Sequence, residues 1–365
     1  MAADADGCHY MCSCRVRHNF FVHSVGAHFS YDGDDVKFRQ SYGADWQATH
    51  GSEVPLAAAL EDVKRQREER LRAPREAEAR LARIAAEYRP QRPEAYRLQP
   101  EAFLAAGFRE LVGGLRACGR PSEVAACVAG CRERGLLAEV RQGLWTFEVF
   151  TEAFCDLLEE ELGSFYASGL PNTAPNTMNR KGIILKELGF GPGLLDPLVR
   201  EHVDVLAGSL LPMCTDGLDS YRAFTVLYDF SEDGDRDLAT HYDNAEVTLN
   251  VNIGGSWEGG QVEFFGPVME AKSHSNPEPV AVSVRRGHAI LHAGQDLHRA
   301  TPITSGRRHN LIVWCRSSGV RNDTCPMCMS QPRVVPTTAL FDEGFTVPPC
   351  ELVSALLEGD DDLYS

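Results

Sequence analysis

The apolar residues of this chain follow a helical spacing in its first part and a strand-like spacing in its second. Between residues 53 and 92, the segment "LEDVKRQREERLRAPREAEARLARIAAEY" sets apolar positions three and four apart among many charges, which predicts an amphipathic helix. Pro74 lies within it and should break or kink the helix into two pieces, because proline lacks an N–H donor and crowds the preceding turn. The charged positions are expected to face solvent.

Turn and linker signals surround this helix. In "FFVHSVGAHFSYDGDDVKFRQ", the pair Asp32-Gly33 separates two short β-prone stretches and predicts a hairpin. The segment "RPQRPEAYRLQP" carries three prolines in twelve residues and is typical of a linker, so a domain boundary is expected near it. The alanine- and leucine-rich residues 101–137 predict further short helices.

Two more helices are predicted before the spacing changes. Thr151 has the position of an N-cap, with the acidic Glu152 in the first turn of "EAFCDLLEEELGSF". The segment "GLLDPLVREHVDVLAGSLL" repeats the helical spacing further along the chain.

From Tyr221 onward, short strand-like runs alternate with turns rich in glycine and aspartate. These runs are "RAFTVLYDF", "AEVTLNVNI", "QVEFF", "VAVSV", "HAILHA" and "HNLIVWC". Closely spaced strands after helices predict an α+β fold, namely a jelly roll or β-sandwich buttressed by helices, with a helix-rich N-terminal region. We expect a cysteine-containing helical region over 1–140, a domain over 141–335 with its β core at about 221–316, and a C-terminal tail over 336–365 whose acidic end is disordered.

Charge and composition narrow the classes of partner. The 365 residues include 36 basic and 52 acidic side chains, a formal charge of −16, which makes nucleic acid an unlikely partner. The sequence has no apolar run long enough for a bilayer and no secretory signal at its start, so we expect an intracellular protein of the cytoplasm or nucleus without a membrane partner. Its 12 cysteines are therefore interpreted mainly as reduced thiols.

A candidate metal site begins in "ATHYDNAEVTLNVNIGG". In an extended segment, residues i and i+2 point to the same side, so His241 and Asp243 can direct a nitrogen and an oxygen to one point. His298 at the start of a later strand-like run offers a third ligand, and two histidines with one carboxylate form the facial triad of non-haem Fe(II) sites. His292 is an alternative to His298, although its place in "GHAILHAG" with His288 favours a core histidine.

A candidate anion clamp follows ten residues after His298. Arg308 opens the strand-like "RHNLIVWC", where a guanidinium can pair with a carboxylate through two hydrogen bonds. An open iron site beside such a clamp suits 2-oxoglutarate, with O2 at the remaining position. Arg307 competes for this role, while Arg299 and His309 should lie on the opposite strand face, exposed to solvent.

The candidate metal and anion sites, together with the strands around them, resemble a known enzyme family. The segment from about Tyr221 to Cys315 resembles the double-stranded β-helix of the Fe(II)- and 2-oxoglutarate-dependent dioxygenases of the prolyl 4-hydroxylase type. Further segments such as "PNTMN" and "CPMC" resemble one vertebrate branch of these enzymes, strongly after Thr146 and loosely before it.

The resemblance implies a set of roles. Iron would be held by His241, Asp243 and His298, and 2-oxoglutarate by Arg308. Tyr228 corresponds to a tyrosine that helps orient the oxoacid, although a plain core tyrosine is an equal interpretation. Asn252 lies near the position at which some relatives have a second tyrosine that contacts the oxoacid, so this contact is in doubt here.

The implied reaction is hydroxylation of a C–H bond. A protein or peptide side chain is the implied substrate, O2 and 2-oxoglutarate are consumed, succinate and CO2 are released, and L-ascorbate is the implied reductant. The alternative is a non-catalytic β-helix scaffold that recruits partners through the N-terminal helices. A different metal reaction of the cupin type is disfavoured by Arg308.

The cysteines leave a separate question open. Cys325 and Cys328 in "CPMC" have zinc-ligand spacing, and Cys8, Cys12 and Cys14 offer further thiolates if the N-terminus folds back. Reduced thiols without a metal are the alternative.

Overall fold

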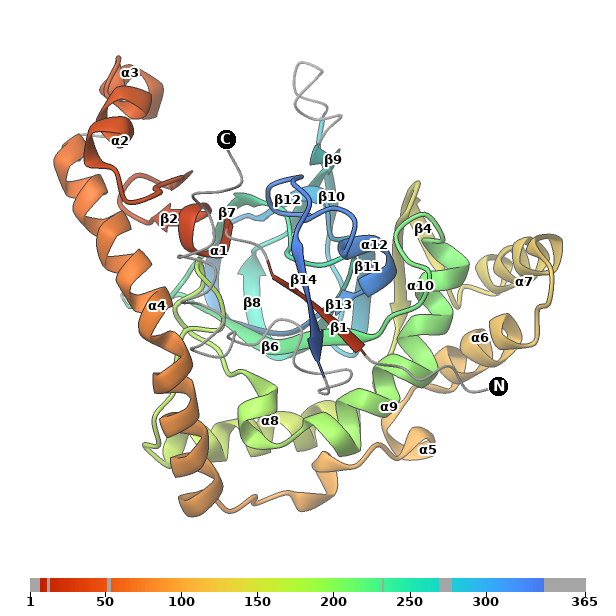
Figure 1. The fold of residues 1–365 in the computed structure, drawn as a ribbon. Coiled ribbons are helices and arrows are strands. Elements are labelled where there is room, and N and C mark those ends of the chain that lie inside the picture. The colour runs from red at the N-terminus through yellow and green to blue at the C-terminus, as the bar shows by residue number, and fades with distance from the viewer. Residues whose placement is uncertain (1–6, 12–13, 51–53, 232, 269–277, 338–365) are drawn as a thin grey trace.

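The computed structural model describes residues 7–11, 14–50, 54–231, 233–268 and 278–337 (Figure 1). Cys12 and the acidic end of the tail lie outside these residues. No helix within the described ranges is long and apolar enough to cross a membrane.

Two antiparallel sheets form the centre of the molecule and confirm the predicted jelly roll. The six-stranded sheet has the order β4 (Ala138–Arg141), β5 (Leu144–Glu148), β11 (His288–Ala293), β8 (Val247–Gly259), β13 (Ile303–Arg316), β6 (Ser220–Asp229). The four-stranded sheet has the order β10 (Val280–Val282), β9 (Val262–Pro267), β12 (Asp296–Ala300), β7 (Leu238–His241). All six predicted strands are present, whereas β4, β5, β7 and β12 were not among the predicted runs.

The alternation of residues along β8 explains how this sheet has two different faces. Val247 and Leu249 belong to the large buried cluster shared with the helices. Their neighbours Thr248 and Asn252 are also buried, although both are polar. Because adjacent residues of a strand point to opposite faces, one face of β8 packs on helices and the other presents polar groups to the barrel interior.

Helices cover the outer face of the six-stranded sheet. In Figure 1, α8 (Glu152–Ala167) runs beneath the barrel, while α6 (Ala106–Arg116) and α7 (Pro121–Glu133) lie to one side. As predicted, Thr151 caps α8, because its Oγ1 accepts a hydrogen bond from Phe154 N at 3.2 Å. The remaining helical elements of this layer are α5 (Pro100–Phe103), η2 (Leu185–Leu188), η3 (Gly191–Leu195), α9 (Asp196–Leu198), η4 (Val199–Val203) and α10 (Asp204–Leu210). The short helix α12 (Ser318–Arg321) follows β13 and contacts the N-terminal strand.

The predicted break at Pro74 is wrong. A single helix, α4, spans Leu56–Glu87 and runs along one side of the molecule (orange in Figure 1). Both halves are held by other elements: Leu60 packs in a buried cluster with the N-terminal residues, and Arg80 forms an ion pair with Glu187 at 2.6 Å. Tertiary contacts on both sides of Pro74 thus offset the hydrogen bond that proline cannot make.

The hairpin predicted around Asp32-Gly33 is wrong, because the residues after Gly33 form a helix and not a second strand, and a different hairpin lies earlier in the segment. β2 (Phe20–Val22) pairs with β3 (Ala27–Phe29), and the turn closes where Gly26 N donates to Val22 O at 2.8 Å. Gly26 has φ 70°, a conformation that glycine adopts without strain. Asp32-Gly33 instead precedes α2 (Asp35–Tyr42), which is followed by α3 (Trp46–His50).

The proline-rich segment does not behave as an open linker. It contains η1 (Pro93–Tyr96), and the Tyr96 ring stacks on Phe190 with ring centroids 4.0 Å apart. One buried cluster extends from Ile84 to Cys315 and joins the helices to the six-stranded sheet. The division of the chain at residue 140 therefore stays a prediction.

The two ends of the described chain meet. β1 (Gly7–Met11) pairs antiparallel with β14 (Arg333–Thr337), and α1 (Cys14–Arg17) follows β1 closely. The first and last strands therefore form a separate two-stranded sheet.

Candidate metal centre

The structure brings His241, Asp243 and His298 together. His241 ends β7 and lies directly opposite His298 on the neighbouring antiparallel strand β12. Asp243 follows two residues after His241, with its Oδ1 at 3.7 Å from His241 Nε2 and 3.9 Å from His298 Nε2. The three ligand atoms lie within 4.8 Å of one another, close enough to face a single ion.

Hydrogen bonds behind these side chains fix which atoms face inward. The Nδ1 atoms of His241 and His298 each lie 2.8 Å from a backbone oxygen, of Ala239 and Asp296 respectively. Each Nδ1 is therefore the protonated nitrogen and each Nε2 keeps its lone pair, the usual arrangement of a metal-bound histidine. Thr248 Oγ1 donates to Asp243 Oδ2 at 2.7 Å and leaves Oδ1 toward the histidines.

Burial and neighbouring groups set the protonation of His241 and Asp243. Burial, then the neighbouring His298, lowers the pKa of His241 to about 3, and His28 of β3 contributes in the same direction. Burial alone would raise the pKa of Asp243, but the surrounding histidines outweigh it and lower that pKa. A neutral imidazole beside an ionised carboxylate is the state that a divalent metal requires.

His292 occupies a different side of the same carboxylate. Its Nε2 lies 3.8 Å from Asp243 Oδ2, the oxygen that already accepts the Thr248 hydrogen bond. The group of three potential ligands includes His298 and not His292. His292 is 1% exposed, as expected for a core histidine. The geometry thus favours His298 as the third member of the cluster.

Arg308 is buried inside the barrel beside Tyr228. The two residues pair across β13 and β6, and the Arg308 Cζ lies 4.3 Å from the centroid of the Tyr228 ring. Arg308 Nη1 donates to Gly260 O, whereas its Nε has no hydrogen-bond partner among the described residues. Burial lowers the pKa of Arg308 and raises that of Tyr228. A buried guanidinium with an unused donor is suited to an anion.

The neighbours of Arg308 take up other positions. The side chain of Arg307 is 62% exposed and its Nε lies 3.3 Å from Asp229 Oδ2. Arg299 is exposed as predicted and pairs with Glu263 at 2.6 Å. The predicted exposure of His309 is wrong, because it is 8% exposed and lies 3.8 Å from Glu159 of α8. Helix α8 covers that face of β13, which no spacing within the strand shows.

Polar residues of β8 also line the interior: Asn252 was expected near the oxoacid, whereas Thr248 and Asn250 were not predicted. Asn252 lines the same small cavity as Arg308, and its Nδ2 donates to Val284 O at 3.1 Å. Asn250 accepts a hydrogen bond from Asn310 at 2.6 Å, and Thr248 holds Asp243. The signal in the sequence was the alternation of these polar residues with valine and leucine directly after the histidine and aspartate.

The jelly roll with this centre defines a class, the 2-oxoglutarate- and iron-dependent oxygenases. Residues 84–216 match the model of the OGFOD2-like domain. Two proteins named 2-oxoglutarate and iron-dependent oxygenase domain-containing protein 2 are similar over almost the full length. The one from Xenopus tropicalis is 39% identical over 92% of this chain and 93% of its own length, and the one from Homo sapiens is 36% identical over 92% and 93%.

The chain therefore belongs to the family of 2-oxoglutarate and iron-dependent oxygenase domain-containing protein 2. This confirms the branch expected from its sequence. A shorter match, 33% identical over 26% of this chain and 10% of the relative, is to a procollagen lysyl hydroxylase and glycosyltransferase of Acanthamoeba polyphaga mimivirus. The non-catalytic scaffold hypothesis is not favoured, because the histidines, the aspartate and the buried arginine are all present and directed inward.

Proposed function

We propose that His241, Asp243 and His298 hold Fe(II) in this oxygenase and that it hydroxylates a C–H bond with release of succinate and CO2. One observation carries the assignment of ligands: two Nε2 atoms and one carboxylate oxygen face one another, and each histidine is oriented by a backbone oxygen behind it. This donor set is that of non-haem Fe(II) sites with open positions. When bound, the iron supplies the oxidising chemistry that couples decarboxylation of 2-oxoglutarate to hydroxylation.

The part of Arg308 is to hold the distal carboxylate of 2-oxoglutarate. Arg308 is 5% exposed, and its Nε donor has no hydrogen-bond partner in the described structure. A carboxylate in the adjoining cavity would satisfy this donor and balance the buried charge. Tyr228 lies against the same guanidinium and would help orient the oxoacid, with Asn252 on the cavity wall in place of a second tyrosine.

The substrate class proposed is a protein or peptide side chain. Support comes from the resemblance to prolyl 4-hydroxylases and from the partial similarity to a relative whose name includes a procollagen lysyl hydroxylase. L-Ascorbate is proposed as the reductant that returns oxidised iron to Fe(II), and the cytoplasm or nucleus as the location.

The decisive experiment measures succinate from 2-oxoglutarate with Fe(II) and O2 for the full chain and for Asp243→Ala. The variant should lose more than about 100-fold of the turnover, because removing a ligand costs more than removing a group that merely orients one. Fe(II) binding, measured separately, should be lost in parallel.

Asp237→Ala is the matched control. Asp237 is an exposed carboxylate six residues before Asp243, so its removal should leave turnover within about two-fold. If Asp243→Ala turned over 2-oxoglutarate at the wild-type rate, the ligand assignment would be contradicted. Incubating the active enzyme with protein extracts and searching for a gain of one oxygen atom then tests the substrate class.

A further inference from the structure

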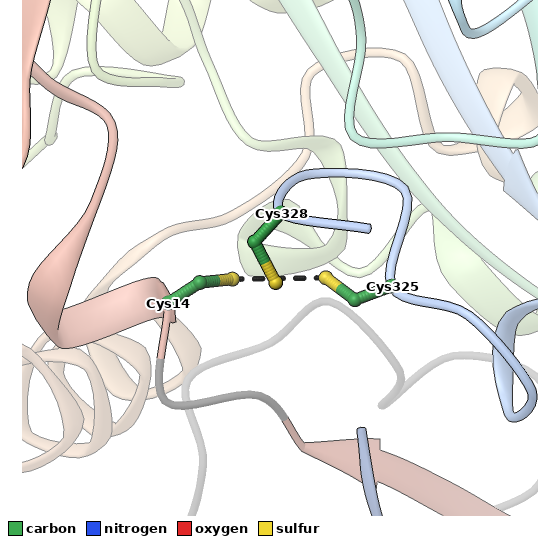
Figure 2. Close-up of side chains that lie close together, drawn as sticks. All are labelled: Cys14, Cys325 and Cys328. Atoms are coloured by element: carbon green, nitrogen blue, oxygen red, sulfur yellow. Dashed lines mark hydrogen bonds between the residues drawn. The ribbon is translucent and has the colours of Figure 1, made fainter. Parts of the chain in front are cut away.

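A second cluster of metal-type ligands lies where α1 approaches the loop after α12. Cys14 begins α1, while Cys325 and Cys328 lie in the loop after α12. Figure 2 shows their three sulfur atoms turned toward one another. The Sγ atoms of Cys14 and Cys325 are 3.6 Å apart, and all three sulfurs lie within 4.8 Å of one another.

The distances match a shared metal ion better than a disulfide. With Zn–S bonds of about 2.3 Å in a tetrahedron, two thiolates of one zinc site lie about 3.8 Å apart. A disulfide requires a separation of about 2.05 Å. The 3.6 Å between Cys14 and Cys325 therefore lies close to the edge of a zinc tetrahedron.

The surroundings suit a closed structural site. Cys14 is 5% and Cys325 0% exposed, and Met327 and Cys328 pack against them. The loop is a tight turn in which Met329 N donates to Cys325 O at 2.8 Å and Cys325 N to Ser330 O at 2.9 Å. Met329 has φ 62°, which is unfavourable for a residue with a side chain.

We propose that Cys14, Cys325 and Cys328 bind a structural Zn²⁺ as thiolates, each releasing its proton on binding. One further donor, a side chain or water, completes the four ligands. The proposal needs neither Cys8, whose side chain lies outside the described part, nor Cys12, and it does not depend on the iron site.

The site has a defined structural task. Tyr242 stands between His241 and Asp243, and its hydroxyl donates to Met327 O at 3.0 Å, inside the Cys325–Cys328 turn. The zinc ion would join helix α1 to the Cys325–Cys328 turn. This turn, through the hydrogen bond from Tyr242, holds the backbone between His241 and Asp243. The role of the zinc ion is therefore to position that segment and not to take part in catalysis.

The experiment measures zinc in full-length protein purified without chelator from zinc-supplemented cells. Asp243→Ala is the background, so that zinc bound by the iron site does not contribute. About one zinc per chain is expected in this background and almost none after adding Cys325→Ser. Cys118→Ser is the matched control, since Cys118 is a half-buried cysteine outside the cluster that donates to Gly114 O, and it should keep the zinc.

A second measurement does not depend on the Asp243 variant. Co²⁺ added to wild-type protein from which zinc has first been removed with a chelator should give the sulfur-to-cobalt charge-transfer absorption of a thiolate site, which a site of histidine and carboxylate lacks. Cys328→Ser, at the half-buried edge of the cluster, should abolish this absorption while circular dichroism reports the fold.

Three outcomes would overturn the proposal. They are a chain without zinc in the Asp243→Ala background, zinc that Cys325→Ser leaves in place, and a Cys14–Cys325 disulfide in peptides mapped without reduction. None of these bears on 2-oxoglutarate turnover, which tests the iron site separately.

Discussion

Arg307 and Arg308 show how neighbouring residues of one strand meet opposite environments. Arg308 is 5% exposed and lies on the Tyr228 ring, whereas the Arg307 side chain is 62% exposed beside Asp229. A guanidinium in a low-dielectric interior interacts far more strongly with a carboxylate than one in water. The chemical difference between the two arginines is therefore one of position alone.

Arg308→Gln should raise the KM for 2-oxoglutarate by about 10- to 100-fold, the loss expected when charge-assisted hydrogen bonds of about 1.5–3 kcal/mol are removed. Initial rates of succinate formation over a series of 2-oxoglutarate concentrations measure this. Arg307→Gln should change KM less than about two-fold, because an exposed ion pair contributes little. Equal effects of the two variants would refute the assigned clamp.

His292 makes the stability of the metal-free protein depend on pH. Burial, then the neighbouring His298, lowers the pKa of His292 to about 4 from 6.5. The unfolded chain therefore binds a proton between pH 6.5 and 4 that the folded chain excludes. Stability from this residue is complete above pH 6.5 and falls as the pH is lowered toward 4.

Urea unfolding with chelator present should show about 1 kcal/mol less stability from His292 at pH 5.5 than at pH 7.5. His292→Asn, whose amide nitrogen can replace Nδ1, should lower stability at both pH values but reduce the difference between them by that amount. An unchanged difference would mean that folding does not lower the pKa of His292.

For single residues, the spacing along the sequence was enough to predict most of the candidate site. The two-residue spacing of His241 and Asp243, and the choices of His298 over His292 and Arg308 over Arg307, agree with the observed geometry. Thr248 was not predicted, because its bond to Asp243 depends on how the chain turns into β8. His309 was misplaced, because its cover comes from a helix remote in sequence.

Among the elements, the turn between β11 and β12 acts directly on the metal centre. Gly294 O accepts a hydrogen bond from Asp243 N at 2.8 Å, and Gly294 N donates to Glu246 O at 2.9 Å. A Cβ at Gly294 would lie 1.9 Å from Ala245 O, so this turn and the segment after Asp243 fit only without a side chain.

Gly294→Ala should therefore shift the Asp243 segment and weaken Fe(II) binding by about 10- to 100-fold, the range for groups that orient a ligand. Titration with Fe(II) under nitrogen measures the affinity. Gly208→Ala is the control, since an added Cβ meets nothing within 4 Å in α10 and should preserve or increase stability. Iron affinity that Gly294→Ala leaves intact would show that the segment is not held by this turn.

The prediction of helices and strands was accurate where apolar residues were strongly periodic. It failed where contacts with other elements determine the local structure. β6, β8 and β13 follow the alternation in the sequence, whereas β7 and β12 are short and their polar residues belong to the centre. The failure at Pro74 has a similar origin, because contacts with β2 and η2 stabilise α4 on both sides of the proline. Local propensity gives way to tertiary contacts in both cases.

At the scale of the whole molecule, one carboxylate of α8 joins that helix to the end of α4 and to the proline-rich segment. Glu161 of α8 is 0% exposed and accepts hydrogen bonds from the hydroxyls of Tyr88 and Tyr96, each at 2.7 Å. It also accepts from the backbone N–H groups of Gln91 and Arg92 at 2.9 and 2.7 Å. These bonds make the proline-rich segment part of the core, which its composition did not indicate.

Glu161→Ala should lower the free energy of unfolding by about 3–5 kcal/mol, because it leaves buried donors unsatisfied. Chemical denaturation followed by circular dichroism measures this. Glu160→Ala, next in the helix with a 55% exposed side chain paired to Arg92, should cost less than about 1 kcal/mol. Similar losses for both variants would argue against a special contribution from Glu161.

The pairing of the first and last described strands, β1 and β14, also bears on the order of events during synthesis. Cys14 and Cys325 are 311 positions apart, so at 5–20 residues per second the first thiol waits about 15–60 s before the second is made. β13, the last strand of the two barrel sheets, ends at Arg316 and is synthesised shortly before Cys325. β1 can therefore pair with β14 only after every strand of the two barrel sheets has been synthesised.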